Sequence, residues 1–304
     1  MTFDFYSFRF VFSALDPIVF PPGQPGNILR GAFGNAFRGI VCSPDCLGAL
    51  QCPTRDSCDY ARIFEPASAA SGPSGLRDQP RPFVFRAAYL DGRTIQPDER
   101  FWFDVNLFET QNPPLESFAL AIGRLAKDGL GPLRGRANLV SVEQRPISVS
   151  LDPNPAEARN LHVEFVTPTE LKNDNQLVER PEFDVLFARA RDRVSTLRSL
   201  YGAGPLEIDF RAMGERAAAI RMTRCELRQV EAERRSSRTG QVHGIGGFVG
   251  VADYEGDLGE FIPYLDAAQW TGIGRQCSWG KGELRVRVAQ ASGLPTGQAG
   301  DLPH

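Results

Sequence analysis

The order of expected strands and helices repeats once along the chain, and this repeat constrains the fold more than any other feature. Side chains alternate with period two over residues 3–14, and apolar residues recur at helical spacing over 26–41. The same patterns predict strands near 82–89 and 100–108, a helix over 115–127 and a strand over 137–149. The first half therefore has the order strand, helix, strand, strand, helix, strand.

The second half shows the same order again. Its expected elements are a strand over 161–166, a helix over 181–200, strands over 205–210, 219–231 and 247–254, a short helix over 257–268 and a strand over 283–289. Two successive βαββαβ units predict an α+β fold with two tandem ferredoxin-like domains. The same topology underlies common RNA-binding modules, but it also carries many unrelated activities.

Composition shifts divide the chain. The predicted units are an N-terminal domain 1–149 with a cysteine-rich insertion at 42–80, a polar linker 150–160, a C-terminal domain 161–290 and a flexible tail 291–304. Hydrophobic residues make up 42% of the 304 residues, which is enough to bury two cores. The formal net charge of −3 excludes a globally basic nucleic-acid binder and leaves room for local basic faces.

The sequence predicts neither a signal peptide nor a membrane-spanning segment. No run of about 18 apolar residues occurs, so the sequence predicts neither a membrane-spanning helix nor a membrane partner. The apolar N-terminus carries Asp4 and Arg9 and is interpreted as a strand, not as a signal peptide. Six cysteines are too few for a disulfide scaffold, and we expect a cytoplasmic location.

Four of the six cysteines fall close together in the insertion. They are Cys42, Cys46, Cys52 and Cys58. Four thiolates can enclose one Zn²⁺ tetrahedrally, so we expect a structural zinc site with no open position for catalysis. An iron–sulfur cluster uses the same ligands and is the alternative cofactor. The alternative without a metal is that these cysteines are free thiols or form disulfides.

A glycine-rich segment lies between the last expected helix and the last expected strand. Over residues 272–282 it contains Gly272, Gly274, Gly280 and Gly282, with Arg275 and Lys281 between them. Glycine lets backbone N–H groups approach a ligand, and successive N–H groups with nearby cations form an anion-binding concavity. The segment is therefore a candidate phosphate site. A glycine-rich turn without a ligand is the alternative.

Two further groups of arginines are candidate RNA contacts. On the helix over 26–41, Arg30, Gly34 and Arg38 share a face, and the small residue between the arginines would admit a phosphate backbone. The second group follows the 219–231 strand: Arg234, Arg235 and Arg238. For both groups the alternative is an ordinary solvated surface.

The glycine-rich segment resembles the signature of the RAMP superfamily of CRISPR-associated proteins, although Lys281 stands where a hydrophobic residue is expected. Other segments resemble one branch of it, the CRISPR repeat-RNA processing endoribonucleases. These segments are 27–34, 58–65, 101–109, 165–172, 236–241 and 247–257. They follow the order of the family over nearly the whole chain.

The resemblance implies that the chain binds CRISPR repeat RNA and cuts it once per repeat. Cleavage in this family needs no metal and no catalytic cofactor. The 2′-hydroxyl attacks the adjacent phosphate and leaves a 2′,3′-cyclic phosphate and a 5′-hydroxyl. Such a reaction requires a general base, a general acid and positive charge at the phosphorane. Subunits of a CRISPR effector complex are further possible partners.

The chain departs from the family in its histidines. No histidine follows the first helix, where the cysteine insertion stands, and Thr271 occupies the place of a histidine before the glycine-rich segment. His162 is interpreted as a strand-face residue with a hydrogen-bond partner. His243, in a loop after the arginines, is the best acid or base, with a solvated loop histidine as the alternative.

Two other functions remain open at this stage. A non-catalytic RNA-binding subunit of an effector complex would keep the fold and would explain the missing histidines. A metal-stabilised protein with a ligand unrelated to RNA would fit the acidic charge balance, but it leaves the glycine-rich segment unexplained.

Overall fold

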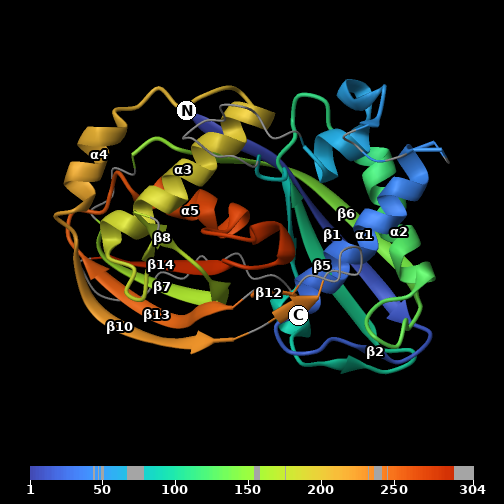
Figure 1. Ribbon diagram of the computed structural model, residues 1–304. Helices are drawn as coiled ribbons and strands as arrows, with labels where there is room; N and C mark the ends of the chain where they lie inside the picture. The colour runs from blue at the N-terminus through green and yellow to red at the C-terminus, as the bar shows by residue number, and fades with distance from the viewer. Residues whose placement is uncertain are drawn as a thin grey trace.

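The computed structural model confirms two tandem ferredoxin-like domains, with the cysteine-rich insertion in the first (Figure 1). The structure describes residues 1–43, 45, 46, 48, 51–66, 79–153, 158–174, 176–231, 233–235, 242–244 and 246–290. The predicted tail at 291–304 lies outside these residues. No helix of the described part is both long and apolar enough to cross a bilayer.

The first domain forms an antiparallel sheet in the order β3-β5-β1-β6. Its strands and helices are β1 (Thr2–Ala14), α1 (Pro25–Val41), β3 (Phe83–Arg86), β5 (Arg100–Leu107), α2 (Leu115–Asp128) and β6 (Ala137–Ser150). A small ribbon pairs β2 (Ile18–Val19) with β4 (Thr94–Ile95). Short helical turns complete this domain: η2 (Arg55–Ser57), η3 (Tyr60–Phe64) and η5 (Ala88–Leu90).

The second domain repeats this topology in a sheet of order β10-β13-β7-β14. Its main elements are β7 (Ala158–Thr169), α3 (Phe183–Tyr201), α4 (Phe210–Ala217), β10 (Arg221–Val230), β13 (Gly247–Glu255), α5 (Ile262–Thr271), η6 (Cys277–Trp279) and β14 (Leu284–Gln290). Two small ribbons accompany it: β8 (Lys172–Asn173) with β9 (Gln176–Leu177), and β11 (Glu233–Arg235) with β12 (Val242–Gly244).

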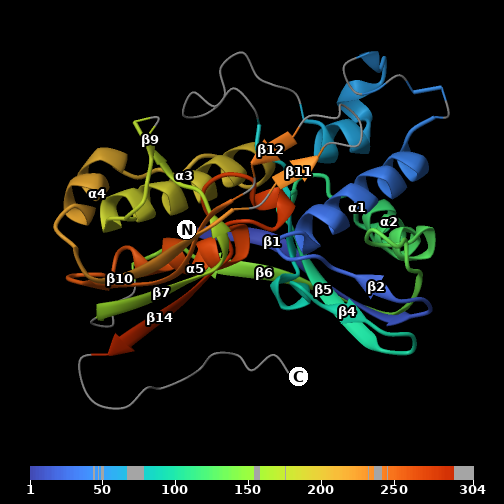
Figure 2. The same cartoon turned by 60° about the horizontal axis from the view of Figure 1, so that its bottom comes forward.

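The helices lie over one face of the two sheets and leave the opposite face without a helical cover (Figure 2). In the first domain the alternating Phe8, Phe10 and Phe12 of β1 are fully buried in a core closed by α1 and α2. Phe3 and Phe5, at the start of the same strand, belong to the core of the second domain. Strand β1 therefore contributes side chains to both cores and joins the two domains.

Two expectations about the second half need correction. The strand predicted over 205–210 is wrong, because Asp209 is the N-cap of α4 and accepts hydrogen bonds from the backbone N–H groups of Arg211 and Ala212. The linker predicted over 150–160 is shorter, because β6 continues to Ser150 and β7 begins at Ala158.

Candidate nucleic-acid interface

The glycine-rich segment forms a tight loop between α5 and β14. Gly274 and Gly282 have φ angles of 75° and 68°, in the left-handed region that favours glycine. A Cβ at Gly274 would meet the carbonyl oxygen of Glu170, and a Cβ at Gly282 would meet that of Ile273. Close backbone packing therefore explains why these two positions are glycine.

Much of the loop's backbone is already hydrogen-bonded within the protein. The N–H of Ile273 donates to Gly282 O at 2.9 Å, that of Gly282 to Pro168 O at 3.1 Å, and that of Arg275 to Glu170 O at 3.1 Å. The prediction that the loop offers its N–H groups to a phosphate is therefore wrong for these three positions. The prediction of an anion site therefore depends on the two cations of the loop, Arg275 and Lys281.

The two cations of the loop lie in different surroundings. The Arg275 side chain is 56% exposed, and its guanidinium pairs with the Glu170 carboxylate at 2.5 Å. Lys281 is only 3% exposed, and its Nζ donates to Gly23 O at 2.9 Å. Burial lowers the pKa of Lys281, and the charge of Asp91 only partly opposes that effect. Among the described residues, no carboxylate hydrogen-bonds this ammonium group.

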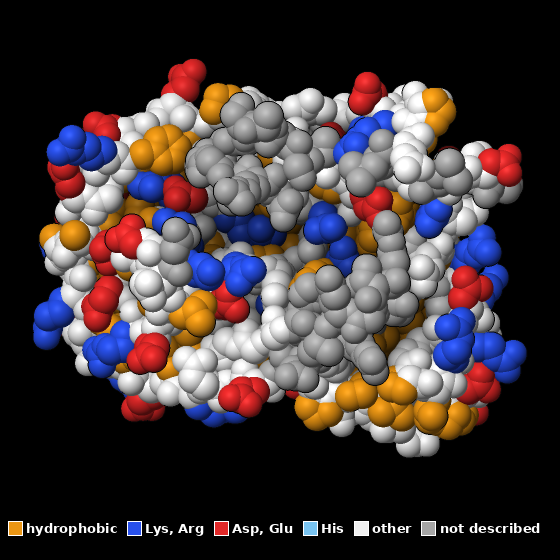
Figure 3. Space-filling model, viewed as in Figure 1, with side chains coloured by type: hydrophobic (Ala, Val, Ile, Leu, Met, Phe, Trp, Pro, Cys, Tyr) orange, Lys and Arg blue, Asp and Glu red, His pale blue; other side chains and the backbone are white. Residues whose placement is uncertain are grey.

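Lys281 lines a cavity of about 470 Å³ between the two domains. The first domain contributes the turn before α1, the first residues of α1 and the segment after β3. The second contributes β7, β10, β13, β14 and the glycine-rich loop. Arg228 and Arg285 add two cations to its wall, and Asp91 and Glu231 add two carboxylates. Figure 3 shows Lys and Arg side chains along the hollow between the two halves of the molecule.

The arginine face of α1 is not the open surface that the sequence suggested. Arg30 is 7% exposed, and its guanidinium lies 4.7 Å from the ring centre of Phe64 and 5.4 Å from that of Trp279. A Cβ at Gly34 would collide with the Phe64 ring. The small residue therefore admits an aromatic ring and not a phosphate backbone. Of this set only Arg38 is exposed, and its guanidinium donates to Cys46 O at 2.6 Å.

The four clustered cysteines lie near one another. The pKa of Cys42 is raised to about 12, first by burial and then by the neighbouring thiols of Cys58 and Cys46. The pKa of Cys52 is lowered, chiefly by its hydrogen bond with Thr54. Nevertheless, no group of three or more His, Cys, Asp or Glu side chains within the described ranges has an arrangement that could hold a metal ion.

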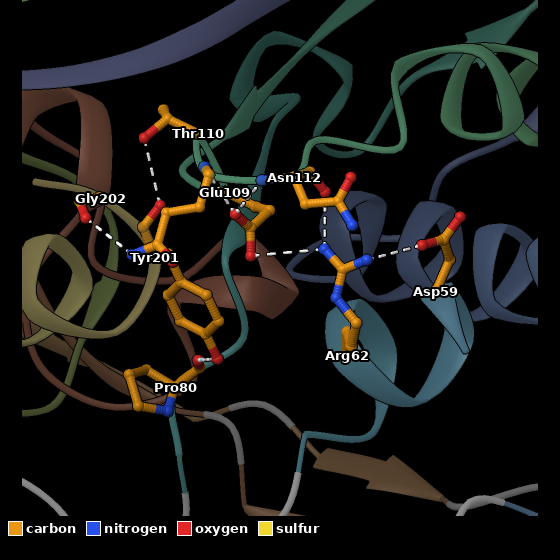
Figure 4. A network of polar contacts seen from close by, with 9 residues as sticks. Asp59, Arg62, Pro80, Glu109, Thr110, Asn112, Tyr201 and Gly202 are labelled. Atoms are coloured by element: carbon orange, nitrogen blue, oxygen red, sulfur yellow. Dashed lines mark hydrogen bonds and ion pairs between the residues drawn. The ribbon is translucent and has the colours of Figure 1, made fainter. Parts of the chain in front are cut away.

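A polar network attaches the insertion to the end of β5 (Figure 4). The guanidinium of Arg62 donates to Asp59 at 2.9 Å and to Asn112 O at 2.6 Å, and it lies 3.6 Å from the Glu109 carboxylate. Glu109 is 6% exposed and also accepts from the backbone N–H of Asn112. A buried carboxylate with these partners fixes η3, and with it Phe64, against the first domain.

The same network continues to the C-terminal end of α3 in the second domain. Thr110 donates to Tyr201 O through its N–H at 2.8 Å and through its hydroxyl at 3.2 Å. The Tyr201 hydroxyl donates to Pro80 O at 2.8 Å. The insertion, the first sheet and the second domain are therefore connected at one place (Figure 4).

The β11–β12 hairpin lies beside the glycine-rich loop. Arg234 pairs with His243 in the hairpin, and the Gln276 side chain donates to Gly244 O at 3.1 Å. The side chains of Arg234, Arg235 and His243, and all of Arg238, lie outside the described part of the structure. The roles predicted for these four residues therefore stay predictions.

Sequence reasoning missed the side chains that hold the loop in place. The Arg86 guanidinium donates to the carbonyl oxygens of Gln269 and Trp270, both at 2.9 Å, and the Asn106 amide donates to Trp270 O at 3.0 Å. Arg193 donates to Thr271 O at 2.9 Å. These contacts satisfy the last carbonyls of α5 just before the loop. The sequence gives no signal for them, because Arg86 and Asn106 come from the other domain.

Two family models match successive parts of the chain. Residues 163–284 match the model of the CRISPR-associated endoribonuclease Cas6. Residues 3–156 match AF_1859_N, described as an N-terminal domain. A comparison with the sequences of curated proteins found no match.

Several solved structures have a similar fold. The product complex of Cas6 (TTHB231) from Thermus thermophilus is 14% identical, with 93% of this chain and 99% of that chain covered and a TM-score of 0.57. The Cas6 (TTHA0078) product complex is 16% identical, with 93% and 99% covered and a TM-score of 0.52. A chain of the Cas6-RT-Cas1–Cas2 complex is 10% identical, with 96% of this chain and 29% of that chain covered and a TM-score of 0.58.

At these identities the solved structures show a shared fold, and the family models carry the assignment. The two matched ranges follow each other along nearly the whole chain, and the second contains α5 and the whole glycine-rich segment. The chain belongs to the Cas6 family of CRISPR RNA-processing endoribonucleases.

Proposed function

We propose that this chain binds the repeat of precursor CRISPR RNA and cleaves it without a metal ion. The observation that carries the proposal is the cavity between the domains, where Lys281 is buried and, within the described part of the chain, has Gly23 O as its single hydrogen-bond partner. A buried ammonium without a hydrogen-bonded carboxylate is costly, and a phosphate supplies the missing charge and acceptors. Arg228 and Arg285 on the same wall add to the attraction.

The cleavage step needs only acid–base chemistry at such a phosphate. A base removes the proton of the 2′-hydroxyl, and the 2′-oxygen forms a bond to phosphorus. The bond from phosphorus to the 5′-oxygen breaks, and an acid protonates that oxygen. Lys281, held in place by the loop and by Gly23, would stabilise the charge that develops on the phosphorane.

His243 is the residue we propose as acid or base. His243 precedes Gly244 in β12, and the Gly244 carbonyl accepts a hydrogen bond from Gln276 of the glycine-rich loop. Its neighbours Arg234 and Arg235 in β11, with Arg238 and Arg275, are proposed to bind the RNA backbone. Arg30 is not proposed as an RNA contact, because its guanidinium packs against the rings of Phe64 and Trp279.

We further propose that Cys42, Cys46, Cys52 and Cys58 hold one structural Zn²⁺, with an iron–sulfur cluster as the alternative. The mutual effect of these thiols on the pKa of Cys42 supports their proximity. Their present arrangement is not that of a metal site, so metal binding would draw the four sulfurs together. The insertion would then hold Phe64 more firmly on α1.

The function is tested by incubating the protein with labelled cognate repeat RNA in EDTA and analysing the product ends. The proposal expects one cut per repeat, a cyclic phosphate on one side and a 5′-hydroxyl on the other. His243→Ala is expected to slow that cut about 100- to 10,000-fold without loss of affinity. Tight binding of the repeat with no cleavage by the wild type would replace this function with the non-catalytic RNA-binding subunit.

A further inference from the structure

The guanidinium of Arg30 connects the cysteine insertion to the glycine-rich loop. It extends from α1 and packs against the Phe64 ring of η3 at 4.7 Å and against the Trp279 ring of η6 at 5.4 Å. Phe64 follows the cysteines of the insertion, whereas Trp279 lies within the glycine-rich segment of the second domain. One buried cation therefore joins two segments that are far apart in the sequence.

The insertion side of this contact is held by several neighbours. The Phe64 ring packs on Tyr60 at 5.2 Å and on Phe83 at 6.0 Å, and Gly34 leaves the space that the ring fills. The Phe64 carbonyl accepts a hydrogen bond from Arg81 Nε at 2.7 Å. The ring against which the Arg30 guanidinium packs therefore has a fixed position on α1.

The loop side of the contact leads directly to Lys281, two residues after Trp279. A Cβ at Gly26, in the first turn of α1, would meet the backbone of Trp279, so helix and loop touch there. The Lys281 ammonium donates to Gly23 O at 2.9 Å, just before the same helix. The start of α1 therefore fixes the loop through its backbone, and Arg30 fixes it through a side chain.

The chemistry of arginine suits this bridging position. A guanidinium is planar and weakly hydrated, so it packs on aromatic rings, whereas a lysine ammonium is a compact and strongly hydrated charge. With 7% exposure and two ring contacts, Arg30 reaches a ligand only through what it holds in place. What it holds is the Trp279 ring, and with it the backbone that carries Lys281.

We propose that Arg30 is a positioning residue for RNA cleavage, which acts through Trp279 to hold Lys281 at the reacting phosphate. The proposal rests on the function proposed above and makes the packing of the cysteine insertion part of the cleavage site. A misplacement of about 1 Å by a mutation away from the chemistry can cost about 100-fold in rate. Because a displaced Lys281 keeps its charge, loss of the contact should slow cleavage far more than it weakens RNA binding.

The test measures two quantities on the full chain in EDTA. One is the single-turnover rate of cleavage of labelled repeat RNA with the protein in saturating excess. The other is the affinity for the same RNA with a 2′-deoxy substitution at the cut, which the proposed mechanism leaves intact. Arg30→Met is expected to lower the rate about ten- to 100-fold and to change the affinity by less than about threefold.

The second domain offers a matched control in Arg191. This arginine of α3 is 8% exposed, and its guanidinium lies 5.6 Å from the ring centre of Phe187 and 4.8 Å from that of Phe210. Neither ring belongs to the insertion or to the glycine-rich loop. Arg191→Met therefore makes the same change in a similar setting and is expected to cleave at the wild-type rate, at a temperature where urea unfolding shows both variants folded.

A double variant separates positioning from a general structural role. If Arg30 acts through Lys281, Arg30→Met should slow cleavage no further in a chain that already carries Lys281→Met. Independent effects of the two substitutions would instead multiply. Phe64→Leu removes the ring from the other side of Arg30, leaves the loop unchanged, and takes the place of Arg30→Met in every comparison if that variant does not fold.

Each result separates the positioning role from the function on which it rests. Cleavage at the wild-type rate by Arg30→Met would overturn the positioning role, as would an equal slowing by Arg191→Met or a full multiplication in the double variant. Wild-type cleavage by Lys281→Met would also overturn it, because Arg30 would then have no group to position. Failure of the wild-type protein to cut the repeat would remove the proposed function itself.

Discussion

Lys281 is a cationic side chain that is buried, and this is the main residue-scale argument for a phosphate site. Lys281 is almost completely removed from solvent, and its ammonium donates a hydrogen bond to Gly23 O. Burial lowers its pKa, so the neutral form is more accessible than in an ordinary lysine. A bound phosphate would reverse that shift, because an adjacent negative charge favours the protonated form.

Replacement of Lys281 by methionine keeps the apolar stem and removes the charge. We expect Lys281→Met to weaken repeat-RNA binding about tenfold or more, the value of one hydrogen bond to a charged group. Since each cation displaces counterions, the loss should shrink as salt is raised. Anisotropy titrations at two salt concentrations measure both effects. Equal affinities of variant and wild type at low salt would place the phosphate elsewhere.

Asp266, on α5, gives a second residue-scale prediction. Burial raises the pKa of its carboxyl from 3.8 to about 6, and the hydrogen bond from Gln269 opposes that only in part. The folded state therefore binds the proton more tightly than the unfolded state. This stability is present at about pH 4 and is lost as the pH rises through about 6.

Asp266→Asn should remove that pH dependence. The variant is expected to match the wild type at about pH 4 and to exceed its free energy of unfolding by about 2–3 kcal/mol at about pH 7. Urea unfolding at both pH values measures the difference. A constant difference between the two proteins would show that Asp266 does not titrate in this range.

At the scale of elements, helix α1 is shaped by what packs on it from the cysteine insertion. Gly34 lies under the Phe64 ring, whereas Gly31, three residues earlier in the same helix, has nothing within 4 Å of the position of a Cβ. Gly34→Ala is expected to destabilise the protein by about 1–3 kcal/mol through overpacking. Gly31→Ala should stabilise it by about 0.5–1 kcal/mol through helix propensity.

Thermal or urea unfolding of the two alanine variants measures the difference in their stability. The two substitutions are identical, so the difference reflects only the surroundings of each glycine. If Gly34→Ala were as stable as Gly31→Ala, the contact of η3 with α1 would not exist in solution.

The insertion itself is the element on which the metal proposal depends. As-purified protein, prepared without chelator, is expected to contain about one zinc per chain. Chelation should lower the free energy of unfolding, because the folding of so short a segment is coupled to its metal. Elemental analysis measures the content. A brown protein that contains iron would change the assignment to an iron–sulfur cluster, and a metal-free protein of equal stability would exclude both.

Much of the architecture follows from periodicity. The period-two run of β1 and the helical spacing of α1 were predicted to within about a residue, because each depends on a face turned toward one core. The 205–210 segment alternates just as well, but Asp209 closes a helix cap there. A short alternating pattern therefore does not predict a strand reliably where a nearby side chain accepts the hydrogen bonds of the backbone N–H groups.

The site was less predictable than the fold. The glycine-rich loop is visible in the sequence, but the burial of Lys281 depends on the approach of Gly23 from the other domain. In the same way, Gly34 could not be assigned to an aromatic contact, because Phe64 lies in an insertion without periodicity. Contacts made between distant segments leave no local pattern.

At the scale of the whole molecule, the two domains line one cavity together. Phe3 and Phe5 of β1 pack in the core of the second domain, and Arg86 and Asn106 cap α5 from the first. Their contacts set the position of the glycine-rich loop relative to α1. A strand of RNA in the cavity would therefore touch both domains, and its phosphates would meet cations from each side.

The most direct test of metal-independent cleavage compares two repeat RNAs that differ only by a 2′-deoxy substitution at the nucleotide before the cut. Both are incubated with the wild-type protein in EDTA, and affinity and cleavage are measured together. Because the proposed nucleophile is the 2′-hydroxyl, the deoxy RNA should bind with the same affinity and remain intact, while the ribose RNA is cut. Cleavage of the deoxy RNA, or a metal requirement for cutting the ribose RNA, would contradict the account.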